Sequence, residues 1–209
     1  MISFDEDKEI YSFAKPSETG VEKMKVYMVR HGESVTNFEK RWTGQLDVAL
    51  TEKGEADARR VGEKLCGVSF DKIYASDLIR AARTAEIATG KKPLLDSRIR
   101  EMDVGKFAGA PWSGMTDEQR ALTRREGYAD FGGEAKVDFR ARVSSFMKML
   151  ENSSDSTVAV FTHAGWLRAF FSIALGVEFP IGRILVNNCS HAVFEYSNGK
   201  WALHSWVNL

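Results

Sequence analysis

Four side chains in this sequence could do chemistry together, because each lies just beyond a short β-prone run. They are two arginines and two histidines: Arg30, His31, Arg80 and His163. An arginine guanidinium presents a planar fork of donors that matches phosphate oxygens, and it stays charged at any working pH. A neutral imidazole nitrogen can attack phosphorus and form a covalent intermediate. The residue types therefore point to binding and transfer of a phosphoryl group.

Strands must bring these residues together, and the apolar pattern predicts where the strands lie. Three runs precede the reactive residues: Met24–Val29, Asp71–Ala75 and Thr157–Phe161. Two closing strands are expected near Ala192–Tyr196 and Trp201–Trp206. Helices are expected after the caps Thr51 and Ser76, from about Asp138 to Glu151, and after His163.

This alternation of strands and helices predicts an α/β fold with three α/β/α layers and a mostly parallel central sheet. Ligands of such folds bind beyond the carboxyl ends of the strands. The two arginines and two histidines fall at that edge. Gly32 would let the backbone approach a ligand closely, and helix N-termini nearby would add N–H donors for an anion.

The motifs in this order resemble the histidine phosphatase superfamily, which has the phosphoglycerate mutase-like fold. The resemblance runs from about Met24 to the C-terminus and covers a series of short segments: Val29–Ser34, Asn37, Gly44–Asp47, Leu50–Gly54, Ser76–Ala81, Arg100–Gly105, Gly132–Glu134 and Phe161–Gly165. An isolated Arg-His-Gly is a weak signal. The whole series at family-like spacing is a strong one.

The resemblance implies a role for each matching residue. His31 would be the nucleophile that becomes phosphohistidine, and Glu101 the general acid that protonates the leaving oxygen. Arg30, Arg80 and His163 would hold the phosphoryl group. Secondary phosphate contacts would come from Asn37, from the backbone near Gly44, and from Ala164. The resemblance implies no metal and no cofactor.

The choice between a phosphatase and a mutase depends on the 61 residues between Glu101 and His163. Residues 106–137 of this excursion, the lid segment, would cover the site and select the substrate. In phosphoglycerate mutases the lid is longer, and a tyrosine and a lysine there contact the substrate; the matching positions here hold Val104 and Trp112. The shorter lid resembles the phosphatase branch, including α-ribazole phosphatase and broad-specificity phosphatases, although Ala108 stands where those commonly carry glutamate.

We therefore expect hydrolysis of small phosphomonoesters, with a mutase as the alternative. A binding module that has lost catalysis is a third hypothesis, but His31 and Glu101 are both present. Arg124 and Arg125 are expected in the last turn of a helix capped by Thr116, where they complement the helix dipole. The alternative is that they reach a substrate carboxylate. His191 and His204 are expected to be structural.

Charge and composition limit the partners. The 29 basic and 29 acidic residues cancel, so no global field attracts nucleic acid or an anionic membrane. Residues 1–23 form an acidic arm, which leaves residues 24–209 as one domain with a small positive excess. Cys66 and Cys189 are expected to remain reduced, and no signal peptide is recognised. The expected protein is cytoplasmic, a monomer or homodimer, and acts on a small phosphorylated metabolite.

Overall fold

A computed structural model describes residues 23–178 and 184–208. Apart from Lys23, the acidic arm lies outside the described residues. Six strands form one sheet in the order β3-β2-β4-β1-β5-β6. The strands are β1 (Met24–Arg30), β2 (Lys72–Ala75), β3 (Leu94–Leu95), β4 (Thr157–Thr162), β5 (His191–Ser197) and β6 (Lys200–Val207). Strands β1 to β4 are parallel to one another, and β5 is antiparallel to both of its neighbours, β1 and β6, which confirms the mostly parallel sheet.

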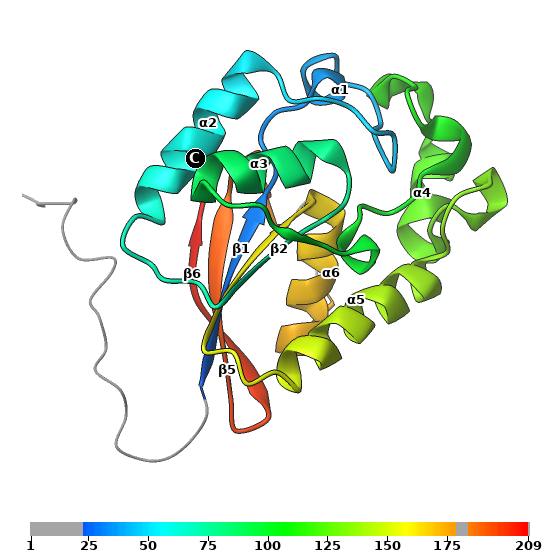
Figure 1. Ribbon diagram of the computed structural model, residues 1–209. Helices are drawn as coiled ribbons and strands as arrows, with labels where there is room; N and C mark the ends of the chain where they lie inside the picture. The colour runs from blue at the N-terminus through cyan, green and yellow to red at the C-terminus, as the bar shows by residue number, and fades with distance from the viewer. Residues whose placement is uncertain (1–22, 179–183, 209) are drawn as a thin grey trace, which may run out of the picture.

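Helices cover both faces of the sheet, as the alternation predicts (Figure 1). The α-helices are α1 (Val35–Phe38), α2 (Glu52–Lys64), α3 (Ile79–Thr89), α4 (Asp117–Glu126), α5 (Lys136–Glu151) and α6 (Ala164–Leu175). Four short 3₁₀ helices accompany them: η1 (Ser97–Ile99), η2 (Gly105–Phe107), η3 (Trp112–Gly114) and η4 (Ala129–Phe131). Helices α2 and α3 lie on one face of the sheet, and α5 and α6 lie on the other.

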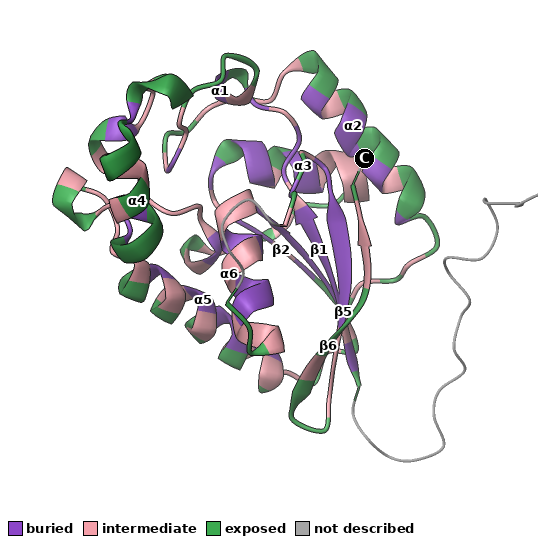
Figure 2. Cartoon of the chain, turned by 180° about the vertical axis from the view of Figure 1, so that it is seen from behind, coloured by how far each residue is buried: buried purple, intermediate pink, exposed green. Residues whose placement is uncertain are grey.

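The central strands β1 and β4 are buried on both faces, and because side chains alternate along a strand, successive residues pack into different cores. In β1, Val26 and Met28 pack into a core with Phe146 of α5 and Trp166 of α6. The intervening residues of β1 pack into a second core, which includes Val61 of α2. Figure 2 shows the central strands as the most deeply buried part of the chain. The sheet is thus held rigidly between two helical layers.

The ends of the helices follow the predicted capping chemistry with one exception. Thr51 accepts a hydrogen bond from the Gly54 N–H at 3.0 Å, and Thr116 accepts one from the Gln119 N–H. The cap predicted at Ser76 is wrong. Helix α3 begins two residues later than Ser76 predicts, because the first helical N–H, that of Ile79, donates to Asp47 Oδ1 at 2.7 Å.

The lid segment shares a small apolar cluster with Val104 and Trp42, beside the main cores. Val104, Phe107 and Met115 are buried in it, and Trp42 and Tyr128 pack against them. Helix α4 lies in this part of the molecule, away from the sheet (Figure 1). The lid is therefore a separately packed layer over the strand ends.

Candidate active site

The carboxyl ends of β1 and β4 bring the two predicted histidines together. Arg30 lies opposite Thr162 in the parallel pairing of these strands, so the next residues of both strands leave the sheet side by side. The His31 N–H donates to the Thr162 carbonyl at 2.9 Å. The ring centroids of His31 and His163 are 5.0 Å apart. The convergence that the strand pattern predicts is therefore present.

Hydrogen bonds on both sides of its ring fix the orientation of His31. Its Nδ1 lies 2.7 Å from the Gly32 carbonyl oxygen, which can only accept, so Nδ1 carries the proton. The Arg80 Nε–H donates to His31 Nε2 at 3.3 Å, so Nε2 bears the lone pair. Burial, Arg80 and Arg30 lower the pKa of His31 well below its ordinary value. The imidazole is therefore neutral at neutral pH, with Nε2 available as a nucleophile.

The loop that carries His31 is fixed by tight backbone contacts. The Gly32 N–H donates to Thr84 Oγ1 at 3.0 Å, and Asn188 Nδ2 lies 3.1 Å from both the His31 and the Gly32 carbonyl oxygens. A Cβ atom on Gly32 would lie 2.4 Å from the Gly54 carbonyl oxygen. Only glycine therefore allows the start of α2 to approach this loop so closely.

Arg80 is held from the first turn of α3 and is almost fully buried, with 1% of its surface exposed. Its two terminal nitrogens donate to the Leu46 carbonyl at 2.7 Å and the Gly44 carbonyl at 2.8 Å. Burial lowers the pKa of Arg80 to about 10, while the nearby Glu101 opposes this shift. The group remains charged at neutral pH, beside the nucleophilic nitrogen of His31.

Three buried nitrogens at this end of the site have no hydrogen-bond partner among the described residues. They are Arg30 Nε and both ring nitrogens of His163. Arg30 does donate from Nη1 to the Val186 carbonyl at 2.6 Å, and burial lowers its pKa to about 10. Burial, with Arg80 next, lowers the pKa of His163 well below its ordinary value. Because buried polar groups are normally paired, the unpartnered N–H groups of Arg30 and of the neutral His163 ring indicate a site for an anion.

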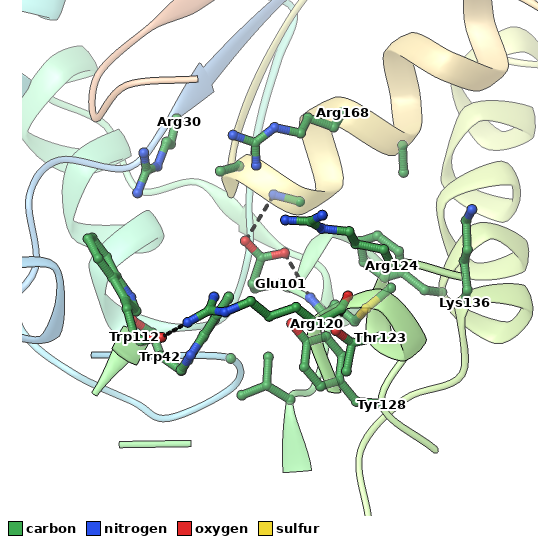
Figure 3. Close-up of a pocket in the computed structure, with 18 of the residues that line it drawn as sticks. Arg30, Trp42, Glu101, Trp112, Arg120, Thr123, Arg124, Tyr128, Lys136 and Arg168 are labelled. Atoms are coloured by element: carbon green, nitrogen blue, oxygen red, sulfur yellow. Dashed lines mark hydrogen bonds between the residues drawn. The ribbon is translucent and has the colours of Figure 1, made fainter. Parts of the chain in front are cut away.

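Glu101 is held beside this group by the first turn of α6. Its Oε2 accepts from the Gly165 N–H at 3.0 Å, and its Oε1 accepts from the Met102 N–H at 2.9 Å (Figure 3). A Cβ atom on Gly165 would lie 2.2 Å from Glu101 Oε1. The observed position of the Glu101 carboxylate therefore requires glycine at position 165.

Arg142 of α5 holds the backbone on both sides of Glu101. It donates to the carbonyls of Arg98, Arg100 and Glu101, and its remaining donors bind the Glu134 carboxylate, at 2.8 Å from Nη2. Glu134 belongs to the lid segment. The Gly-Gly-Glu motif therefore ties the lid to the segment that carries the acid.

A cavity of about 620 Å³ joins these groups to the lid. Seven of the eight predicted site residues line it: Arg30, His31, Asn37, Gly44, Arg80, Glu101 and Ala164. His163, the eighth, is fully buried against His31 instead of forming part of the cavity wall. Asn37 Oδ1 is already occupied by Asn188 Nδ2 at 3.1 Å.

Two cationic residues of the cavity were not foreseen from the sequence, Arg168 of α6 and Arg120 of α4. Arg124, for which a role at the substrate was the alternative expectation, also lines the cavity. Arg125, by contrast, is exposed and pairs with Glu126 at 2.8 Å, so the two neighbouring arginines do not share one role. The available signal for Arg168 was its position as the charged interruption of the apolar run Trp166–Val177.

The other two histidines and the two cysteines lie outside the cavity lining. His191 is buried at the start of β5, and His204 on β6 lies 3.5 Å from Glu195. Cys66 and Cys189 are free thiols, the first exposed and the second buried. Across residues 23–178 and 184–208, no group of three or more metal-ligating side chains could hold an ion. Nor does any helix within these ranges have the length and apolar character needed to span a bilayer.

Comparisons with known proteins agree with this geometry. The family model of the histidine phosphatase superfamily (branch 1) matches residues 26–209. A probable phosphoglycerate mutase, GpmB, from Salmonella choleraesuis is 35% identical over 194 residues, which are 88% of this chain and 90% of the relative.

Two solved structures share the fold. The mycobacterial glucosyl-3-phosphoglycerate phosphatase, solved in complex with VO3, is 27% identical with a TM-score of 0.74, and the match covers 88% of this chain and 98% of that one. A putative α-ribazole-5'-P phosphatase from Escherichia coli has a TM-score of 0.79 over 88% of this chain and 96% of that one. At 22% identity the latter likeness concerns the fold alone.

Proposed function

The chain belongs to branch 1 of the histidine phosphatase superfamily, and from this membership we propose that it hydrolyses small phosphomonoesters through a phosphohistidine at His31. The observation that carries the proposal is the cluster of buried, unpartnered nitrogens on Arg30 and His163 around the neutral imidazole of His31. The Arg30 Nε–H and the single N–H of the neutral His163 ring suit the equatorial oxygens of a phosphoryl group in transfer.

In the first step, the lone pair of His31 Nε2 attacks phosphorus in line with the ester bond. The Nε2–P bond forms as the bond from phosphorus to the leaving oxygen breaks, and Glu101 gives its proton to that oxygen. The Nδ1 proton, held by the Gly32 carbonyl, allows the positive charge on the imidazole to be shared toward the backbone. The arginines stabilise the phosphoryl oxygens.

In the second step, water attacks the phosphohistidine. Glu101 takes a proton from the water, the N–P bond breaks, and inorganic phosphate leaves with His31 neutral again. The Gly165 and Met102 N–H groups hold the carboxylate in one place, so the same group serves both steps. The relative solved with VO3 binds an analogue of phosphate, which supports a phosphoryl site in this family.

The lid favours hydrolysis over mutase activity. Val104 is buried in the apolar cluster of the lid, so no hydroxyl lies at the position that resembles the mutase tyrosine. Trp112 lines the cavity where a lysine would be needed. The mutase remains the second candidate because the 35% identical relative is a probable phosphoglycerate mutase.

The test is His31→Ala assayed with p-nitrophenyl phosphate. We expect a loss of at least ~10⁴-fold in kcat, since removal of a nucleophile costs this much or more. His204→Ala is the matched control because that histidine lies on β6, away from the cavity, and should leave kcat unchanged. Acid-quenched wild-type enzyme given ³²P-labelled substrate should carry label on His31. Turnover retained by His31→Ala, or label on another residue, would refute the covalent mechanism.

A second experiment separates hydrolase from mutase. The enzyme is incubated with 3-phosphoglycerate and 2,3-bisphosphoglycerate, and both 2-phosphoglycerate and released phosphate are followed. We expect release of phosphate as the main reaction. Rapid isomerisation without phosphate release would establish the mutase instead. We also expect full activity in a strong chelator.

A further inference from the structure

The cavity has two ends, with Glu101 between them (Figure 3). The phosphoryl end contains His31 with Arg30 and Arg80, and the leaving-group end is lined by arginines of α4 and α6. Arg80 and Glu101 are each held by their own hydrogen bonds to the backbone. His31 depends in addition on Asn188, a residue that does not line the cavity.

Asn188 lies 157 residues after His31 and reaches it through the pairing of two strands. It belongs to the segment that enters β5, the antiparallel neighbour of β1. The next residue, Cys189, donates its N–H to the His31 carbonyl at 3.3 Å. Cys189 has a positive φ of 58°, a conformation that costs free energy for a residue other than glycine and is often found at functional positions. A strained turn thus follows directly after Asn188.

The amide of Asn188 has one orientation that its neighbours allow. Its Nδ2 lies 3.1 Å from the His31 carbonyl oxygen and 3.1 Å from the Gly32 carbonyl oxygen. Carbonyl oxygens only accept hydrogen bonds, so the amino end of the amide must face them. The Gly32 carbonyl is also the group that accepts from His31 Nδ1. Asn188 therefore holds the acceptor that keeps the ring proton of His31 on Nδ1.

The same amino group determines the orientation of Asn37. Asn188 Nδ2 lies 3.1 Å from the Asn37 amide, and the Ser34 N–H donates to the same atom at 3.3 Å. Because both of these groups are donors, the atom that faces them is Oδ1 of Asn37. The amino group of Asn37 is then left to serve the cavity, whose wall includes this residue. An amino group suits a phosphoryl oxygen, which accepts hydrogen bonds.

We propose that Asn188 is a positioning residue for phosphoryl transfer. Through the Gly32 carbonyl it keeps Nε2 of His31 as the nucleophile, and through Asn37 it directs an N–H donor toward the phosphoryl oxygens. Asn188 itself does not touch the substrate. This inference rests on the proposed function and adds to it a residue from the β5 side of the sheet.

The Gly32 carbonyl matters most during the transfer itself. When His31 Nε2 bonds to phosphorus, the imidazole becomes a cation, and its hydrogen bond from Nδ1 to the Gly32 carbonyl strengthens. If this carbonyl could turn away, a buried and charged N–H group would lose its partner, which is costly. Loss of the Asn188 amide should therefore slow the formation of phosphohistidine.

The first experiment follows a single turnover, with enzyme in excess over p-nitrophenyl phosphate, so that release of p-nitrophenol reports the formation of phosphohistidine. We expect Asn188→Ala to slow this release by about 10- to 100-fold, the range for misplaced reacting groups. Asn187→Ala is the matched control, because Asn187 is the preceding residue and is exposed; it should react at the wild-type rate. Asn188→Leu has nearly the volume of asparagine but no donor, and it provides the answer if Asn188→Ala does not fold.

The second experiment observes the ring proton, which a purely structural role of Asn188 would not affect. In the ¹H NMR spectrum of the wild-type protein, His31 Nδ1–H should give a sharp downfield signal, assigned by its absence in His31→Ala. We expect the Asn188 variants to lose or broaden this signal, because the proton exchanges with water once its acceptor moves. Asn187→Ala should retain it. Thermal unfolding of each variant establishes that it is folded under the conditions of both experiments.

A double-mutant cycle tests the part of the inference that concerns Asn37. Adding Asn188→Ala to Asn37→Ala should slow p-nitrophenol release by a smaller factor than Asn188→Ala does alone, because one of the two effects of Asn188 is already absent. Equal factors would mean that Asn188 does not act through Asn37.

Two other outcomes would overturn the positioning role as a whole. One is release within about threefold of the wild-type rate in the Asn188 variants. The other is slow release with an unchanged ring-proton signal, which would show that Asn188 supports the loop without controlling His31. Labelling of His31 keeps the two proposals apart. If wild-type enzyme forms phosphohistidine and the Asn188 variants form it equally fast, only the positioning role fails; if wild-type enzyme forms none, the proposed function itself fails.

Discussion

The two ends of the cavity are built in different ways. At the phosphoryl end, His31 and His163 follow adjacent parallel strands, and Arg80 is pinned by the carbonyls of the loop that contains Gly44. At the leaving-group end, the cationic side chains come from α4 of the lid and from one position of α6. The first end is buried and densely hydrogen-bonded. The second is partly exposed and held by a small apolar cluster of its own.

This contrast separates reaction chemistry from substrate choice. Groups at strand ends are fixed by the whole sheet, so the phosphoryl end cannot change without disturbing the core. The lid can change its side chains without affecting the strands. Glu101 lies between the two ends, fixed by α6 on one side and by Arg142 and the lid on the other.

After the loss expected for His31→Ala, the largest predicted effect comes from Glu101, where the two ends meet. Glu101→Gln removes the transferable proton, so we expect a loss of about 10³-fold in kcat for an alkyl phosphate, within the range for general acid catalysis. The loss should be much smaller for p-nitrophenyl phosphate, whose leaving group needs little protonation. The measurement is kcat for both substrates. Equal losses would mean that Glu101 positions the phosphoryl group and does not act as the acid.

A smaller loss of kcat is expected when Glu101 is displaced than when it is replaced. In Gly165→Ala the new methyl group overlaps Glu101 Oε1, so the carboxylate must move. We expect kcat for the alkyl phosphate to fall by about 10- to 100-fold, since misplacement by an ångström has effects of this size. Ala174→Gly, on the same helix but outside the cavity lining, controls for altered helix propensity. Unchanged kcat in Gly165→Ala would show that the observed place of Glu101 is not required.

Because His31 and His163 are buried at the phosphoryl end, we expect the free energy of unfolding to depend on pH. The pKa values of His31 and His163 are lowered in the folded chain, chiefly by burial. Well above pH 6.5, these two imidazoles are unprotonated in both the folded and the unfolded chain. As the pH falls below 6.5, the unfolded chain binds protons that the folded chain does not, so the free energy of unfolding decreases.

Thermal unfolding between pH 7.5 and 5 measures this effect. We expect Tm to fall by a few degrees below pH 6.5, at about 2–4 °C for each kcal/mol lost. His163→Gln should flatten the slope, because one of the two groups no longer titrates. A Tm that rises toward pH 5, or a slope unchanged by His163→Gln, would contradict the neutral, buried histidines.

The smallest effect is expected at the outer wall. Trp112 lines the cavity with 42% of its surface exposed. Trp112→Ala should change kcat for p-nitrophenyl phosphate by no more than about threefold, because surface substitutions cost little. A much larger loss would show that the lid helps organise the phosphoryl end, and the division between the two ends would not hold.

The strand-end residues could be predicted from the sequence because their signals are local. An apolar run followed by Arg30 and His31 specifies both a buried strand and its reactive end. The fold class follows from the same alternation of strands and helices, and the described structure confirms it. The prediction of a helix cap at Ser76 was wrong for a physical reason. Asp47 caps α3 from 32 residues away, and no local sequence pattern shows this contact.

The cationic leaving-group end could not be predicted in the same way. Adjacent helical residues differ by about 100° in direction, but the sequence does not say which of Arg124 and Arg125 faces the cavity. Arg168 interrupts an apolar run, and such a position is equally consistent with a residue that extends past the core to water. Only the packing of α6 against the sheet decides between these alternatives.

The central place of β1 also determines the order in which the protein can be assembled. Lys25 is paired with Thr157 on one side and with Glu195 on the other. The strand that carries the nucleophile is therefore synthesised early, but both of its neighbours in the sheet are synthesised late. At ~5–20 residues per second, ribosomal synthesis leaves this apolar strand without its final neighbour for about ten to thirty seconds. A nascent chain in this state exposes apolar surface, which favours aggregation. Catalytic competence is thus acquired only when the β5–β6 hairpin has emerged.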